Sequence, residues 1–376
     1  MGMKLSRALA GGTALMFLIG GGAVEASVAH GAVAASVKHE ASAGTSAAGQ
    51  DAFSEVLGKR KHHRHKRHHR RHRHHVRHQA RPAAGSIYTG TTGRWPAAVN
   101  TRSQAAVNAA YWRYYATGLN VPTGYSASDS ACQVGSTSAA SLTATRSAVN
   151  FVRSLGGLAP VAFSTTLNAR SQRTALMMSA NRRLSHAPSP SWRCYTGVGA
   201  ANAGRSNLAL AYPSITSAGV VGLYMQDAGS ENFAAGHRRW LMDPFTTMMG
   251  SGSTNTANAI TVIGPTSSAR PNPTFVSWPT AGYFPDTLEP SGRWSVSAGS
   301  SQVSFAAASV AVYRNGARIP ATKLRVENGY GQPTMVFDVP ASQARSGTYT
   351  VAVRNIRAGG RAYGYSYTVR MFTPTH

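Results

Sequence analysis

The pattern of hydrophobic and polar positions divides the chain into parts with different periodicities. From Ser103 to Gly264, apolar residues recur every three or four positions in several stretches, which is the spacing of amphipathic helices. From Thr274 onward, short runs of β-branched and aromatic residues are separated by turn residues, which is typical of strands. The pattern predicts an α+β domain over residues 103–264 and an all-β domain over residues 271–376.

The helical pattern of the first domain falls into four segments, residues 103–118, 137–155, 164–184 and 214–225. The third segment is the clearest, because Ser164 stands at the position of an N-cap directly before its first apolar residues. Between the third and fourth segments, residues 189–209 are rich in Gly, Asn and Ser and are predicted to form a loop. Residues 248–264 end in a β-branched run and are predicted to form a strand or hairpin.

The second domain contains strand-like runs at regular spacing and little helical pattern. The runs are Thr274–Trp278, Trp294–Ala298, Val303–Ala307, Val310–Tyr313, Lys323–Val326, Thr334–Val339, Thr348–Val353 and Tyr365–Met371. The dipeptide Asn315-Gly316 lies after one of them and is a strong hairpin signal. Short strands at this spacing predict an immunoglobulin-like β-sandwich, in which we identify no catalytic constellation.

The N-terminus has the pattern of a secretory signal. Lys4 and Arg7 precede the apolar run Ala8–Val24, which ends at the small-x-small sequence Val24-Glu25-Ala26. We therefore predict a signal peptide over residues 1–26, with a retained N-terminal anchor as the alternative. Residues 27–102 are rich in Ala, Ser and Gly and then in basic residues, which predicts an arm without a fold. The expected localisation is secreted or extracellular, including association with the cell wall.

Charge is concentrated in one run of this arm. The chain has a net charge of +26, and Lys59–Arg81 alone holds 11 Lys/Arg and nine His with no acid. Such a run repels itself, so we expect it to be disordered and to bind an anionic cell-wall polymer or lipid surface. The export signal and the lack of interleaved aromatic residues argue against nucleic acid. A solvated cationic linker, or loose binding of transition metals by the histidines, is the alternative.

The cysteines fit the same compartment. Cys132 and Cys194 are the only two in the chain, and in an exported protein they are expected to form one disulfide. Two buried free thiols are the alternative.

Only two histidines lie outside the basic run and the terminal segments. They are His186, two residues before Pro188, and His237, which follows Gly236. Two imidazoles with a carboxylate and a water are a known arrangement for zinc, so both are candidate metal ligands, although no HExxH-like spacing is present. The other interpretation is that both are hydrogen-bonded residues of a polar cleft. It places Arg238 and Arg239 in solvent, and Trp240 and Leu241 in the core.

Acidic residues are few near these histidines. Between residues 103 and 264 the carboxylates are Asp129, Asp227, Glu231 and Asp243, and Asp243 precedes Pro244 as a turn residue would. Asp227 or Glu231 is therefore the candidate third ligand or base of a zinc-dependent, peptidase-like hydrolase that uses His186 and His237. A serine hydrolase has less support, because no GxSxG motif is present.

Several motifs together resemble a known family. VNFVRSLGGLAPV, LSHAP, GRSNLAL and GHRRWLMDP occur in this order within residues 137–263. This stretch resembles the CAP superfamily (SCP domain), which includes cysteine-rich secretory, insect antigen 5 and plant pathogenesis-related proteins. The resemblance implies an α-β-α sandwich whose shallow central cleft contains His186 and His237. It also implies diverse roles, among them lipid or sterol binding and occasional proteolysis.

The same resemblance implies two cleft acids that this chain lacks in register. The matching positions are Ser206 and the segment Val220–Leu223, so Asp227 or Glu231 would have to move into their place. We therefore expect a secreted, non-enzymatic CAP-domain protein that requires no cofactor and binds a lipid or small molecule in its cleft. The zinc-dependent hydrolase is the alternative.

Overall fold

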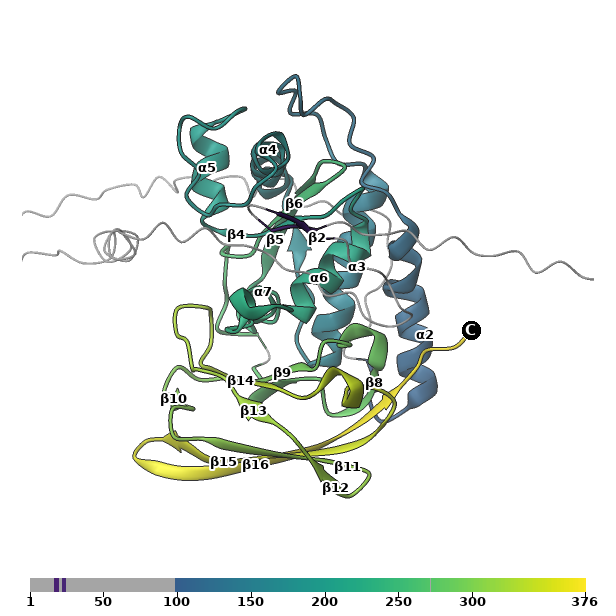
Figure 1. Cartoon of the computed structure of the whole chain (residues 1–376), viewed down its shortest axis with the longest axis vertical. Helices are drawn as coiled ribbons and strands as arrows, with labels where there is room; N and C mark the ends of the chain where they lie inside the picture. The colour runs from purple at the N-terminus through teal and green to yellow at the C-terminus, as the bar shows by residue number, and fades with distance from the viewer. Residues whose placement is uncertain (1–16, 20–21, 25–98, 271) are drawn as a thin grey trace, which may run out of the picture. The chain divides into compact units, whose positions relative to one another are not determined.

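The computed structural model describes residues 17–19, 22–24, 99–270 and 272–376 (Figure 1). Strands β1 (Phe17–Ile19) and β2 (Gly22–Val24) pair antiparallel within the predicted signal peptide. The rest of that peptide and residues 25–98, with the basic run Lys59–Arg81, lie outside the described residues. Among the described residues, no helix has the length and apolar character needed to cross a membrane.

The predicted helices form, and side chains cap most of them. The helices are α2 (Gln104–Tyr114), α3 (Ala139–Leu155), α4 (Thr165–Asn181), α5 (Gly197–Ala203), α6 (Ser217–Gln226) and α7 (Gly236–Leu241), with short 3-10 turns at Ala116–Asn120, Ser230–Asn232, Asp286–Leu288 and Ala341–Gln343. Ser164 caps α4 as predicted, because its Oγ accepts a hydrogen bond from the backbone N–H of Leu167. Ser103, Ser138 and Thr196 cap α2, α3 and α5 in the same way. Satisfying the first free N–H groups fixes where each helix begins.

A four-stranded sheet in the order β3-β5-β6-β4 lies at the centre of the helical domain. Its strands are β3 (Ala162–Phe163), β4 (Ser206–Leu210), β5 (Met248–Ser253) and β6 (Ala257–Thr261). Leu208 and Ala259 pack with α4, whereas their chain neighbours Ala209 and Ile260 pack with α3 and α6. Alternate residues of a strand face opposite sides, so both faces of this sheet are covered. Figure 1 shows α4 and α5 on the side opposite α6, which confirms the α-β-α sandwich.

Two glycines bring α4 close to the sheet. A Cβ at Gly250 would lie 2.4 Å from the backbone carbon of Leu167, and one at Gly252 would lie 2.2 Å from the backbone nitrogen of Gln172. No side chain fits at either position. The helix that ends near His186 is therefore seated directly on the hairpin β5–β6, which confirms the hairpin predicted for this segment.

The loop predicted for residues 189–209 is partly wrong. This segment contains α5 and most of β4. Strand β4 was missed because it opens with Ser206 and Asn207, which look like loop residues but are buried. Their side chains are hydrogen-bonded inside the domain, so burial does not leave their polar atoms unsatisfied.

The C-terminal domain is a sandwich of two sheets, in the orders β13-β14-β9-β7 and β12-β11-β15-β16-β8, with β10 added on β15. Its strands are β7 (Phe275–Trp278), β8 (Gly282–Pro285), β9 (Arg293–Ala298), β10 (Val303–Ser304), β11 (Ser309–Arg314), β12 (Ala317–Ile319), β13 (Thr322–Lys323), β14 (Thr334–Asp338), β15 (Gly347–Ala358) and β16 (Arg361–Phe372). Each of the eight predicted runs overlaps a strand, although Lys323–Val326 does so only at Lys323, where β13 ends, and β8 and β12 were not predicted. The buried rings of Trp294 from one sheet and Tyr349 from the other meet edge to face at 5.2 Å.

The predicted hairpin at Asn315-Gly316 is confirmed. It joins β11 to β12, and both residues have positive φ, 48° and 85°. This is the conformation that a two-residue type I′ turn requires.

One hydrophobic core runs through both domains. Phe151 of α3 and Val220 of α6 belong to the same cluster of buried side chains as Trp278 and Phe284 of the sandwich. The chain end also returns to the helical domain, where Asn108 and Trp112 of α2 donate hydrogen bonds to the carbonyl of Thr375. The two domains are therefore packed as one body over residues 99–270 and 272–376.

Candidate functional site

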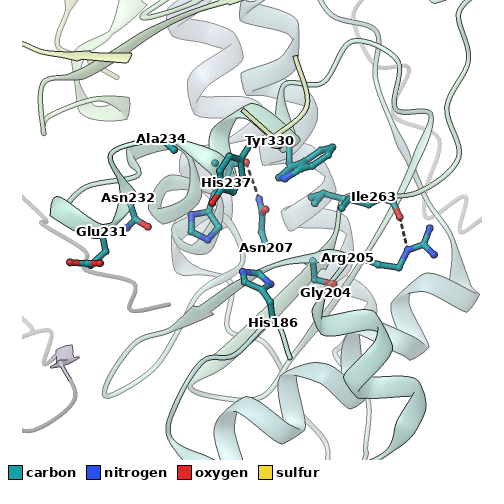
Figure 2. Close-up of a pocket in the computed structure, with 15 residues that line it drawn as sticks. His186, Gly204, Arg205, Asn207, Glu231, Asn232, Ala234, His237, Ile263 and Tyr330 are labelled. Carbon is teal, nitrogen blue, oxygen red and sulfur yellow. Dashed lines mark hydrogen bonds between the residues drawn. The ribbon is translucent and has the colours of Figure 1, made fainter. Parts of the chain in front are cut away.

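A cleft of about 210 Å³ contains both predicted histidines (Figure 2). Its lining comes from the loop after α4, from β4, from the residues that follow β6, from the 3-10 turn before α7, from α7 and from the β domain. The lining residues are His186, Gly204, Arg205, Ser206, Asn207, Glu231, Asn232, Ala234, Gly236, His237, Trp240, Val262, Ile263, Gly329 and Tyr330. The fold thus brings together two histidines that are distant in sequence and adds residues from the second domain.

His237 is oriented by Asp227. The carboxylate Oδ1 of Asp227 lies 2.5 Å from Nδ1 of His237, and its Oδ2 accepts a hydrogen bond of 3.0 Å from the backbone N–H of Arg238. Asp227 is placed there because it ends α6 in the left-handed conformation, with φ of 46°. The ring of Tyr224 stacks on the imidazole at 5.4 Å. The contact between Asp227 and His237 favours the tautomer of His237 that carries its proton on Nδ1 and its lone pair on Nε2.

His186 is oriented by the backbone. Its Nδ1 lies 2.9 Å from the carbonyl oxygen of Ala203, the last residue of α5. Although His186 is partly exposed at the cleft, the surrounding protein removes water from its ring and lowers its pKa below the usual 6.5, and the nearby His237 acts in the same direction. At neutral pH the imidazole of His186 is therefore uncharged, and donation from Nδ1 leaves the lone pair on Nε2.

The four candidate carboxylates have different surroundings. Glu231 lines the cleft and is exposed, whereas Asp129 lies beside the disulfide. Asp243 accepts hydrogen bonds from the N–H groups of Phe245 and Thr246, so the predicted turn role is confirmed. Of the two acids expected to replace those missing in register, Asp227 reaches His237.

A catalytic zinc site needs three protein ligands. Within the described ranges, no group of three or more His, Cys, Asp or Glu side chains is arranged to hold a metal ion. Asp227 does not supply the third ligand, because its carboxylate contacts Nδ1 of His237 and the backbone N–H of Arg238, on the side of the ring away from the Nε2 lone pair. The described residues thus offer two oriented imidazoles and do not fit the three-ligand site.

Arg238 and Arg239 contradict the interpretation that placed them in solvent. Their exposed fractions are 2% and 3%. Leu241 is buried as expected, whereas Trp240 is only half-buried and lines the cleft. The guanidinium of Arg238 forms a salt bridge of 2.7 Å with Glu289 of the β domain and donates to the carbonyl oxygens of Met225 and Gln226. An arginine can be buried when a carboxylate and carbonyl oxygens surround it. Here the carboxylate belongs to Glu289, which is distant in sequence, so the local pattern around Arg238 did not reveal it.

Glu289 is equally enclosed. Its carboxylate accepts hydrogen bonds from Arg238, Trp278, Ser291 and the backbone N–H of Arg293. Burial nevertheless raises the pKa of Glu289 to about 7, because the removal of water outweighs these opposing contacts.

Arg293 connects the β domain to the loop that carries Asp227. It is paired with Asp338 at 3.0 Å, and its guanidinium donates to the carbonyl oxygens of Asp227 and Gly229. The second domain therefore holds the segments on both sides of His237. Sequence reasoning missed Glu289, Arg293 and Tyr330. The paired arginines after His237, which were expected in solvent, were the signal that could have indicated such contacts.

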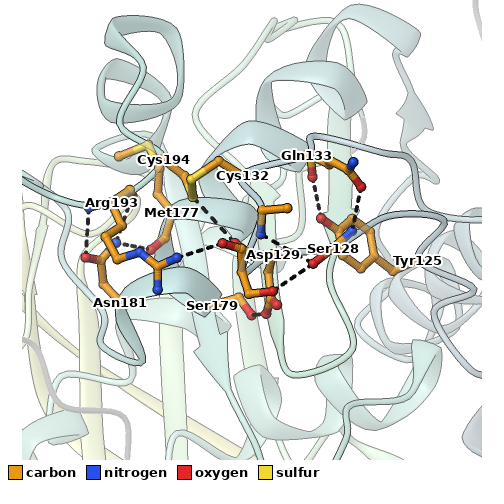
Figure 3. Close-up of a disulfide and its surroundings, with 12 residues drawn as sticks. Tyr125, Ser128, Asp129, Cys132, Gln133, Met177, Ser179, Asn181, Arg193 and Cys194 are labelled. Carbon is orange, nitrogen blue, oxygen red and sulfur yellow. Dashed lines mark hydrogen bonds between the residues drawn. A yellow bond between two sulfur atoms is a disulfide. The ribbon is translucent and has the colours of Figure 1, made fainter.

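The predicted disulfide between Cys132 and Cys194 is confirmed, with an S–S distance of 2.06 Å (Figure 3). It ties the loop before α3 to the loop after α4, and Arg193 adds a hydrogen bond of 2.7 Å to the carbonyl of Ser130. Neither cysteine lines the cleft. The bond therefore tethers the loop that carries His186, at Cys194, without forming part of the cleft lining.

Comparison with known proteins agrees with this geometry. Residues 146–263 match the model of the cysteine-rich secretory protein family, CAP. No curated protein matches the chain. Among solved structures, PcoC, a methionine-rich copper resistance protein from Escherichia coli, is similar over 26% of this chain and 93% of that chain, at 16% identity and a TM-score of 0.19, which is too low to support an argument. Residues 146–263, which place His186 and His237 in one cleft, therefore belong to a CAP domain.

Proposed function

We propose that this protein is secreted, binds a ligand in its CAP cleft without turnover, and is held on an anionic envelope polymer or lipid surface by Lys59–Arg81. The observation that carries the proposal is the fixed orientation of the two cleft imidazoles, each held through Nδ1 by a protein group. Fixed hydrogen-bonding groups in a concave, partly apolar site are typical of ligand recognition. Ser206, the serine in the cleft lining, donates to the carbonyl of Asn202 and is buried, so it is not presented as a nucleophile.

The cleft and the basic run have different charge, which supports separate roles. Among the residues that line the cleft, Arg205 and Glu231 balance each other and His186 is uncharged. The run Lys59–Arg81 carries 11 Lys/Arg and no acid. A polyanion is attracted by the run, whereas a balanced cleft selects its ligand by shape and hydrogen bonds.

The proposal is tested by retention on isolated cell-wall material at low and high ionic strength. Deletion of residues 59–81 should abolish the retention that is lost at high ionic strength, because salt screens the attraction between exposed charges. His237→Ala should abolish the retention that persists at high ionic strength. Full retention of both variants at both ionic strengths would refute the proposal.

The alternative is the zinc-dependent hydrolase, and one observation favours it. A buried aspartate that holds Nδ1 of a histidine leaves Nε2 able to bind zinc, and metal-binding histidines commonly have such a partner. In zinc titrations the full chain and its His186→Ala/His237→Ala variant share the same His-rich run, so their difference reports the cleft alone. We expect no difference. A cleft-dependent site of about micromolar affinity would instead support the hydrolase.

A further inference from the structure

The β domain forms part of the wall of the cleft. Gly329 and Tyr330, from the loop between β13 and β14, line it together with His237 and Asn207 (Figure 2). Both glycines around the ring, Gly329 and Gly331, have positive φ, 93° and 58°. The chain therefore makes a sharp turn that presents Tyr330 at its tip.

Arg239 fixes this loop at both ends. Its guanidinium donates to the carbonyl of Glu327 at 2.8 Å and to the carbonyl of Gln332 at 3.0 Å. The same guanidinium lies 5.4 Å from the centre of the Tyr330 ring, within the range of a cation–π contact. Tyr330 is thus held in place although 38% of it is exposed.

The residue before His237 is shaped to receive this ring. A Cβ at Gly236 would lie 2.8 Å from Cδ1 of Tyr330, so a side chain there would displace the tyrosine. A Cβ at Gly331 would lie 3.7 Å from Cε3 of Trp240, which shows that the loop also packs beside the indole. Tyr330 and Trp240 together give the cleft an aromatic wall next to His237.

Polar side chains lie close to this aromatic wall. The side chains of Asn207 and Asn232 and the two imidazoles line the same cleft, and the amide of Asn232 is oriented by donation to the carbonyl of Ala228. An aromatic face beside amide and imidazole groups suits a sugar ring, because the C–H face of a pyranose is apolar and its edge carries hydroxyls. The balanced charge of Arg205 and Glu231 does not favour a charged ligand.

We infer that the cleft is a composite site for an uncharged glycan, in which Tyr330 of the β domain stacks on one sugar ring. The inference rests on the proposed ligand binding and names its ligand class and a specificity-determining residue. The volume of about 210 Å³ is below the roughly 300–1,000 Å³ of pockets that enclose drug-sized ligands. The cleft accordingly holds one ring, and the rest of the glycan extends outside it.

The test is titration calorimetry of the full chain with the tetramer of β-1,4-linked N-acetylglucosamine, at an ionic strength that screens the basic run. Tyr330→Ala should raise the Kd about tenfold or more, and Tyr330→Phe, which keeps the ring, should change it less than about threefold. Tyr363→Ala is the matched control, because Tyr363 is also exposed but does not line the cleft. Circular dichroism of each variant shows that the fold is kept.

An unchanged Kd for Tyr330→Ala, or no binding of the oligosaccharide by the unaltered chain, overturns the inference. Loss of binding in the Tyr363→Ala control overturns it as well, since the effect would not belong to the cleft. These results remain distinguishable from failure of the proposed function. Salt-resistant retention on cell-wall material that still depends on His237 would preserve ligand binding and discard only the glycan and Tyr330.

Discussion

At the scale of single residues, the hydrogen bonds that Nδ1 donates set the orientation and tautomer of both cleft histidines. Asp227 gives His237 a charged partner, whereas His186 has the neutral carbonyl of Ala203. Partial removal of water without a compensating charge disfavours the imidazolium, which is why the pKa of His186 falls below 6.5. The two rings therefore occupy one cleft with different electrostatic surroundings.

The lowered pKa of His186 predicts how stability depends on pH. Its folded pKa lies below the value of 6.5 in the unfolded chain, so the unfolded state binds more protons between these values. The contribution to the free energy of unfolding is fully present above pH 6.5 and is lost as pH falls towards the folded pKa. Urea unfolding at pH 7.5 and 5.5 should show a smaller pH-dependent loss in His186→Gln than in the unaltered chain. An identical loss in both proteins would show that His186 is not the group responsible.

At the scale of elements, the sequence pattern predicted the helices and strands that are determined by residues within the segment itself. Helix α4 was predictable because Ser164 and the periodic apolar positions lie within the segment itself. Strand β4 and the buried state of Arg238 were not, because they depend on partners such as Glu289 that come from distant segments. In the site, motif order brought His186 and His237 together, but it gave no indication that Tyr330 would complete the cleft.

At the scale of the whole molecule, the two domains share one core and a buried ion pair. Arg238, directly after His237, is neutralised by Glu289, while Arg293 holds the carbonyl of Asp227. Through these contacts the β domain helps to hold the residues that orient His237. Because the core is continuous across the domains, we expect them to unfold together in one cooperative transition.

Glu289→Gln tests this coupling at pH 8, where the carboxyl, with a pKa of about 7, is ionised. Removing one partner leaves the buried charge of Arg238 uncompensated, which typically costs about 3–5 kcal/mol of unfolding free energy. The control is Glu327→Gln, which breaks the pair between Arg325 and Glu327 at 3.2 Å, where the side chain of Arg325 is 73% exposed. Exposed pairs contribute about 0–1 kcal/mol, so this variant should unfold almost as the unaltered chain does. Denaturant unfolding followed by tryptophan fluorescence measures both. Equal losses in the two variants would mean that the buried pair between the domains contributes no more to stability than an exposed pair.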